Sequence, residues 1–220
     1  MIRVNVLCEG PTEEQFVNKV LYPHFIDQGI ILTARSLDGG FSYGRLKHQI
    51  IQWLNNDQGA YVTTLVDLYG MNSKYPGYAS SQNLDAQNKV NTIEAEVKAD
   101  ILGSDNLHNR KFIPNVQLHE FEALLFSDPE KMEEWLSLNH TISTDTFKTI
   151  RDAFDSPEHI NDSPHTAPSK RILAIVPAYD KIIEGIIIAQ EIGLSNIRAA
   201  CPHFDAFCTT LENLAPSSNP

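Results

Sequence analysis

The sequence predicts an α/β fold with a mostly parallel sheet of about four strands, flanked by helices and followed by a mainly helical C-terminal part. Short apolar runs alternate with amphipathic segments through residues 1–126, which is typical of parallel strands joined by helices. Beyond residue 126 helical spacing dominates. The 220 residues, 42% of them hydrophobic and 20% charged, are enough to bury the core of a globular protein.

The chain opens on an apolar run, residues 2–8, which is typical of a buried strand, and residues 13–26 have the apolar spacing of a helix. Thr12 and Gln15 have the spacing of a capping box at the start of that helix. Glu13 falls in its first turn, where negative charge meets the positive end of the helix dipole.

Three further strands and two helices complete the alternating region. Between them, the polar loop at 69–83 is long enough to be of functional interest. Pro114 removes one backbone donor, so we expect it at an edge or a bulge of the last strand. The predicted elements are a strand at 30–34, a helix at 46–54, a strand at 60–66, a helix at 85–101 and a strand at 112–118.

The C-terminal part is predicted to be helical. Helices are expected to begin at Asp128, to cover residues 147–154, to run over 172–192 with an interruption near Pro177, and to begin again at Pro202. We divide the chain into an α/β core at 1–126, a helical part at 127–214 packed on the same core, and a flexible tail at 215–220.

The net charge of −11 opposes nucleic-acid binding, which usually depends on a basic surface. Clustered carboxylates also repel phosphates, unless a divalent cation lies between them and reverses the local charge. The acidic composition therefore weakens the case for a nucleic-acid partner but does not exclude it.

Cysteine content and hydropathy indicate the compartment. The three cysteines, Cys8, Cys201 and Cys208, form no C-x-x-C pair, which argues against a disulfide framework or a zinc ribbon and favours a reducing cytoplasm. The N-terminus lacks the pattern of a secretory signal, and the longest aliphatic cluster, 182–189, is too short to span a bilayer. We expect a soluble cytoplasmic protein that does not associate with membranes.

Acidic residues follow three of the predicted strands: Glu9, Asp67, and the pair Glu120 and Glu122. The C-terminal ends of parallel strands meet at one sheet edge, with neighbouring strands about 4.8 Å apart. Carboxylates gathered there either raise one another's pKa values or bind a cation, and an all-oxygen ligand set favours Mg²⁺ or Mn²⁺ over Zn²⁺. Any one of these acids could instead be ordinary polar surface, and it is their number that favours a metal site.

Five stretches of the chain resemble known proteins. Residues 7–13 (LCEGPTE) resemble the V-E-G-x-T-E motif of Toprim domains of the overcoming-lysogenization-defect (OLD) nuclease type, and 66–70 (VDLYG) stands where such domains carry D-x-D. Together with 117–126, 169–172 and 201–207 they resemble a bacterial Toprim-like family of unknown function. That family is similar to RloB-type proteins, which are encoded beside ABC-type ATPases in restriction and phage-defence loci.

The resemblance implies a Toprim-like fold and roles for particular residues. Glu9 would be the acid/base or a metal ligand, Glu13 the second glutamate of the OLD-type motif, and Asp67 the first aspartate of D-x-D. Tyr69 departs from the pattern, because a phenol that titrates near pH 10 cannot replace a carboxylate ligand at neutral pH. Glu120 or Glu122 could supply the missing oxygens, the site could hold one metal, or it could be idle.

Three further residues are candidates for nucleic-acid contacts. His119 precedes the acidic pair, and Lys170 and Arg171 begin a helix after a proline-rich loop. Lys170 would also stabilise the charge that develops during phosphodiester cleavage. The alternative is that all three belong to the solvated surface.

Our leading hypothesis from the sequence is a Mg²⁺- or Mn²⁺-dependent nuclease that serves as the effector of a bacterial phage-defence system. The alternative is a catalytically idle protein of the same fold that binds or regulates a partner ABC-type ATPase. A small-molecule phosphotransferase of the P-loop type is excluded, because the sequence has no G-x-x-x-x-G-K-[ST] motif. The oligomeric state is left open.

Overall fold

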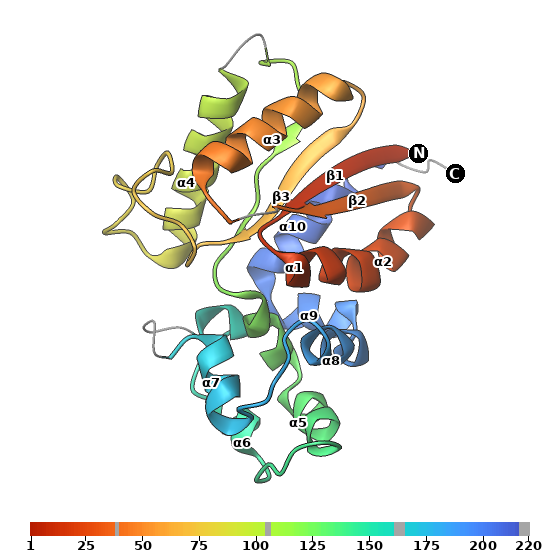
Figure 1. Ribbon diagram of the computed structural model, residues 1–220, viewed down its shortest axis with the longest axis vertical. Coiled ribbons are helices and arrows are strands. Elements are labelled where there is room, and N and C mark those ends of the chain that lie inside the picture. Colours follow the sequence, from red (N-terminus) through yellow and green to blue (C-terminus); the bar gives the residue numbers. More distant parts are fainter. Residues whose placement is uncertain (38–39, 104–106, 161–165, 216–220) are drawn as a thin grey trace.

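A parallel sheet with the strand order β2–β1–β3–β4 lies at one end of the molecule (Figure 1). The computed structural model describes residues 1–37, 40–103, 107–160 and 166–215. The strands are β1 (Ile2–Cys8), β2 (Ile30–Ser36), β3 (Tyr61–Asp67) and β4 (Phe112–Ile113), and β5 (Val116–Gln117) also pairs with β3. All pairings are parallel, and at least one helix separates the two strands of every pair in the sequence, as parallel pairing requires. The predicted fold class is confirmed.

The predicted strand at 112–118 is divided into β4 and β5. Pro114 cannot donate to the ladder, and the side chain of Thr64 takes over the pairing beside it. The Thr64 hydroxyl donates to the carbonyl of Asn115 at 2.7 Å and accepts from the Asn115 N–H at 2.9 Å. The interruption therefore leaves these two backbone groups satisfied.

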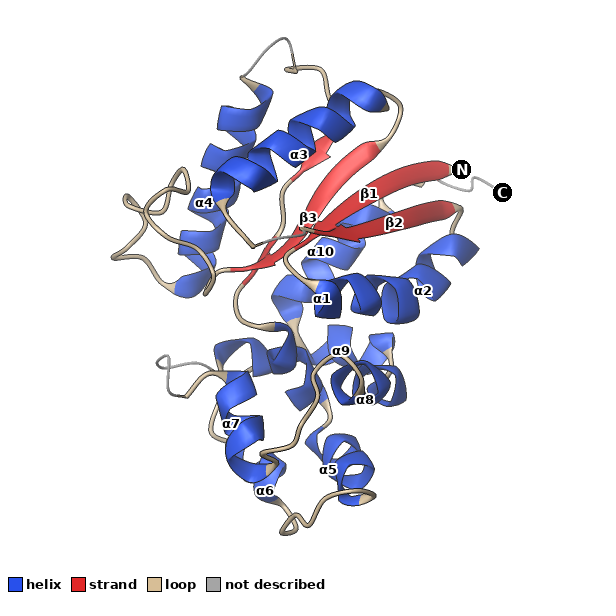
Figure 2. Cartoon of the chain, viewed as in Figure 1, coloured by secondary structure: helices blue, strands red, loops and turns tan. Residues whose placement is uncertain are grey.

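Helices cover both faces of the sheet (Figure 2). On one face α3 (Tyr43–Asn56) and α4 (Ala86–Leu102) pack in a cluster that includes Leu7, Leu46 and Val90. On the other face Val4 and Val6 pack with the helical run of residues 11–27 and with α10 (Pro202–Glu212). Successive β1 residues thus point to opposite faces, and from Val6 to Cys8 the strand is buried on both faces, as expected for a central parallel strand.

The helical run of residues 11–27 consists of α1 (Pro11–Phe16), the π-helical turn η1 (Val17–Leu21) and α2 (Tyr22–Asp27). Its start differs from the predicted capping box. Gly10 is the N-cap residue and its N–H donates to the Glu13 carboxylate at 2.9 Å, whereas Thr12 already lies inside the helix and is buried. Pro11 fixes this start, since proline at the first helical position needs no backbone partner.

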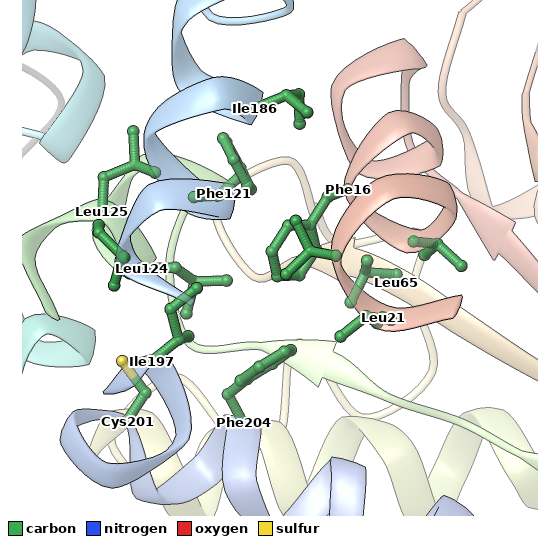
Figure 3. Close-up of a cluster of buried hydrophobic side chains, with 14 of the residues drawn as sticks. Phe16, Leu21, Leu65, Phe121, Leu124, Leu125, Ile186, Ile197, Cys201 and Phe204 are labelled. Atoms are coloured by element: carbon green, nitrogen blue, oxygen red, sulfur yellow. The ribbon is translucent and has the colours of Figure 1, made fainter. Parts of the chain in front are cut away.

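The C-terminal part is mainly helical, as predicted. Its elements are η2 (Phe121–Ser127), α5 (Pro129–Ser137), α6 (Thr146–Arg151), η3 (Pro157–His159), α7 (Pro168–Ile175), α8 (Glu184–Ile192), α9 (Leu194–Ala200) and α10. Figure 3 shows Phe121 of η2 and Phe204 of α10 around Phe16 of α1, with ring centroids 5.2 Å and 5.7 Å from that of Phe16. One hydrophobic core therefore runs from the sheet into the C-terminal helices.

The predicted helix at 172–192 is interrupted over more than a turn, because α7 ends at Ile175 and α8 begins at Glu184. Pro177 removes a backbone donor and disfavours helical backbone at Val176, whose φ of −124° and ψ of 84° lie outside the helical region. We call residues 176–183 the connecting segment. No helix in the described part of the chain is long and apolar enough to cross a membrane, and most of the tail predicted at 215–220 lies outside the described residues.

Candidate functional site

A cavity of about 500 Å³ opens at the C-terminal edge of β1 and β3. Ligand sites of open α/β sheets lie at this edge. Its lining combines five carboxylates and a lysine with apolar and aromatic side chains. The lining residues are Glu9, Gly10, Glu13, Phe41, Asp67, Tyr69, Gly70, Glu120, Phe121, Glu122, Ser169, Leu173, Tyr179 and Lys181.

Glu9 and Asp67 lie at the centre of this arrangement because they follow adjacent strands. The backbone N–H of Asp67 donates to Glu9 Oε2 at 3.3 Å, and the N–H of Gly70 donates to Asp67 Oδ1 at 2.7 Å. Gly70 also packs against the Glu9 carboxylate, where a Cβ would lie 2.9 Å from Oε1 and 3.3 Å from Oε2. The turn after β3 therefore holds both carboxyl groups.

Burial and mutual repulsion perturb the carboxyl groups of the cavity. The pKa of Glu9 is raised to about 8, first by burial and then by the charge of Asp67. Burial, opposed by the Gly70 hydrogen bond, raises the pKa of Asp67 to about 6, and burial raises that of Glu122 to about 7. Carboxyl groups that resist ionisation in each other's presence are typical of a cation or proton-transfer site.

The other acids come from α1 and from the start of η2. Glu13 accepts from the N–H of Gly10, and Glu120 Oε2 accepts from the N–H of Ser169 at 3.0 Å, so Glu120 also anchors the start of α7. Glu122 is only 3% exposed and lines the cavity. All five acidic residues named from the sequence therefore line one cavity, although Glu9 and Glu122 are more than a hundred residues apart.

The connecting segment contributes two residues that the sequence did not single out, Tyr179 and Lys181. The charge of Lys181 lowers the pKa values of Glu9, Asp67 and Glu122, so its ammonium acts on all three. The hydroxyl of Tyr179 is buried and has no hydrogen-bond partner in the described part of the chain. Lys181 lies in the connecting segment, at the helix interruption that Pro177 predicts. No spacing in the sequence, however, links this lysine to the acidic residues.

The predicted basic and histidine contacts lie elsewhere. Arg171 donates from Nε to the carbonyl of Thr166 at 2.7 Å, and its guanidinium lies over the ring of Phe154 at 5.3 Å. Lys170 is exposed in the first turn of α7, and neither it nor the half-buried His119 lines the cavity. The structure thus brings together the predicted acids and leaves the predicted nucleic-acid contacts outside this cavity.

A family comparison matches residues 8–212 to a family described as a domain of unknown function, DUF4276. The chain belongs to the DUF4276 family. The match begins just before Glu9 and extends into α10, so it covers all the acidic residues of the cavity and the connecting segment.

The DUF4276 chain is also similar in structure to the C-terminal region of the Burkholderia pseudomallei OLD protein. The TM-score is 0.53 at 12% sequence identity, over 98% of this chain and 100% of that chain. At this identity the likeness shows the fold alone, and it agrees with the OLD part of the resemblance seen in the motifs. A comparison with curated protein sequences gives no match.

The cavity's donor set fits a hydrated divalent cation. No three of the described histidine, cysteine, aspartate and glutamate side chains form a preassembled metal-binding group. Mg²⁺ does not require one, because it usually keeps several waters and takes one or two carboxylates from the protein. In this DUF4276 chain Glu9 and Asp67 could provide such oxygens, and Glu120 and Glu122 line the same cavity.

Proposed function

We propose that this DUF4276 protein is a Mg²⁺- or Mn²⁺-dependent nuclease that hydrolyses phosphodiester bonds at the cavity beside β1 and β3. One observation carries the proposal: five carboxylates and Lys181, from elements far apart in sequence, line a single cavity at the C-terminal edge of the sheet. The OLD-like fold and the motif around Glu9 support the same reaction class.

The charge of the cavity explains the need for a metal. A phosphodiester brings negative charge into a site whose acids already repel one another, and Lys181 alone does not balance them. A bound Mg²⁺, held by Glu9 and Asp67, would supply positive charge that offsets this repulsion and would polarise a phosphoryl oxygen. Glu120 or Glu122 would supply the carboxylate that the second aspartate of D-x-D provides in the resembling domains, because Tyr69 occupies that position here.

The protein's own groups then have separate tasks. Proton transfer is the alternative to a ligand role for Glu9, because without a bound metal its pKa of about 8 lets the carboxyl group both accept and return a proton. The N–H of Asp67 fixes the orientation of Glu9, and the turn at Gly70 fixes Asp67. Lys181, rather than Lys170, is placed to stabilise negative charge on the reacting phosphate, because it lines the cavity.

The features of the cavity other than charge suit a nucleotide chain. Phe41 and Tyr69 line it, and Tyr69 is 44% exposed, so aromatic faces are available for base stacking. Service as a phage-defence effector, in the cytoplasm and beside an ABC-type ATPase, is part of the proposal and is supported by the motif resemblance.

The direct test is incubation of the purified protein with Mg²⁺ or Mn²⁺ and mixed DNA and RNA substrates. Removal of one preorganised group that stabilises the transition state costs roughly 10²–10³-fold in rate, so Glu9→Gln and Asp67→Asn should each abolish most of the cleavage. Glu96→Gln, an exposed acid on α4, is the matched control and should retain full activity. Cleavage that survives unchanged in both cavity variants would refute the assignment.

A catalytically idle binding or regulatory subunit is the second candidate, and Tyr69 favours it, because this residue replaces a metal-binding aspartate of the resembling domains. Calorimetry separates the two functions. The nuclease should bind Mg²⁺ or Mn²⁺ at millimolar concentration and lose that binding in Asp67→Asn, whereas an idle subunit should show no binding.

A further inference from the structure

A second cavity, of about 470 Å³, lies beside the outer edge of β4 and β5, between α4 and α10. Its volume is within the range of small-molecule sites, and its residues are separate from those of the acidic cavity. Its lining combines neutral polar side chains with apolar ones and a single residue of each charge. The lining residues that matter here are Gln87, Glu94, Lys98, Asn115, His203 and Phe207.

Part of this polarity protects the edge of the sheet. Glu94 Oε1 accepts from the N–H of Val116 at 2.8 Å, and His203 Nε2 donates to the carbonyl of Val116 at 2.8 Å. A carbonyl can only accept, so the His203 proton is on Nε2, and the amide of Gln87 donates to Nδ1 at 3.1 Å. These contacts satisfy backbone groups that would otherwise be open to another strand.

Edge protection does not account for Asn115. This residue is 4% exposed, and its side-chain amide nitrogen has no hydrogen-bond partner in the described part of the chain. Both backbone groups of Asn115 are held by Thr64, so the residue is fixed in place on the cavity wall. A buried amide donor without an acceptor is costly. This nitrogen has almost no exposed surface, so a ligand in the cavity would supply the acceptor once the side chain of Asn115 turns toward it.

The surroundings of Asn115 indicate the kind of ligand. An asparagine amide matches the adjacent acceptor and donor of adenine, and the Glu94 carboxylate can accept from an exocyclic amine. Phe207 and Pro114 add an apolar wall for a flat ring, and the exposed Lys98 is placed to pair with a phosphate. We propose that this cavity binds an adenine nucleotide, with the base at Asn115 and the phosphate at Lys98.

The test is calorimetric titration of the purified, metal-free protein with AMP, with adenosine and with inorganic phosphate. AMP should bind at one site per chain, adenosine should bind more weakly and phosphate alone should not bind. Asn115→Leu should weaken AMP and adenosine by roughly tenfold or more, as expected for one lost hydrogen bond in a buried site. Lys98→Ala, an exposed change that leaves the core intact, should weaken AMP but leave adenosine unchanged.

Asp67→Asn separates the two cavities, since it alters only the acidic one and should leave AMP affinity unchanged. The proposal is overturned if neither AMP nor adenosine binds at millimolar concentration. It is also overturned if Asp67→Asn, rather than Asn115→Leu and Lys98→Ala, abolishes AMP binding, because the nucleotide would then occupy the acidic cavity.

Discussion

Replacing Gly70 with alanine should disable the acidic cavity while leaving the fold intact. The backbone φ of Gly70 is not in the left-handed region, so alanine can adopt it. Its Cβ, however, would lie 2.9 Å from Glu9 Oε1 and 3.3 Å from Oε2, where ordinary contact starts at 3.4 Å. The Glu9 carboxylate must therefore move by about 0.5 Å.

This movement acts on a weak support. Glu9 Oε2 already lies 3.3 Å from its donor, the N–H of Asp67, so a displacement that lengthens this distance breaks the hydrogen bond. The loss costs about 1 kcal/mol of folding stability, whereas misplacing a supported ligand typically costs roughly 10–100-fold in metal affinity or activity. Because the Asp67 hydrogen bond lowers the pKa of Glu9, that pKa should rise above its value of about 8 in the metal-free variant.

Three measurements on Gly70→Ala check this reasoning: thermal unfolding, Mn²⁺ titration, and ¹³C NMR titration of the Glu9 carboxyl group. Gly44→Ala is the matched control, since a Cβ there meets nothing within 4 Å and Gly44 lies in the first turn of α3. The control should be as stable as the wild type or slightly more so. A Gly70→Ala protein with unchanged Mn²⁺ affinity and an unchanged Glu9 pKa would refute the close packing of Gly70 against Glu9.

Three other predictions concern charge. Burial raises the pKa of Glu94 from 4.5 to about 7, so the folded state binds an extra proton in this range and stability falls as pH rises from 4.5 to about 7. Glu94→Gln should flatten the dependence of Tm on pH in this range and raise Tm at pH values above about 7. Hydrogen bonds from Arg198 lower the pKa of Glu212 from 4.5 to about 2, so the stability that the ionised Glu212 contributes is complete above pH 4.5 and lost as pH falls through about 2. Arg198→Met should therefore make the loss of stability between pH 4.5 and about 2 less steep, as measured by circular dichroism during acid unfolding. In nuclease assays Lys181→Ala should reduce the rate about tenfold, as expected for an exposed cation at the cavity, and Lys170→Ala should not; the reverse order would contradict the assignment.

Several features of the site follow from local sequence alone. An apolar run followed by an acid fixes Glu9 at the end of β1, and the same pattern fixes Asp67 at the end of β3. Parallel pairing then requires the two acids to share an edge, since both strands run in the same direction. The pair Glu120 and Glu122 comes shortly after β5, which belongs to the strand predicted at 112–118, and β5 runs parallel to β3.

The start of the first helix shows where local sequence is ambiguous. Thr12 and Gln15 have the spacing of a capping box, but so does the pair of Gly10 and Glu13, which the structure uses. Pro11 favours the earlier start, because its missing N–H is harmless only in the first turn. The single strand predicted at 112–118 failed for a related reason: the effect of Pro114 depends on Thr64, which lies on another strand.

By itself, the sequence determined the α/β class, the strand order along the chain and the acids at the strand ends, because strand and helix periodicity and turn residues act over a few neighbouring positions. The tertiary structure decided that the ammonium group of Lys181 joins those acids. It also decided that the side-chain amide nitrogen of Asn115 has no hydrogen-bond partner among the described residues. Lys181 reaches the cavity because the segment between α7 and α8 packs there, and Asn115 lines a cavity because α4 and α10 converge beside β5. Those placements depend on contacts between residues far apart in the chain, which no local pattern records.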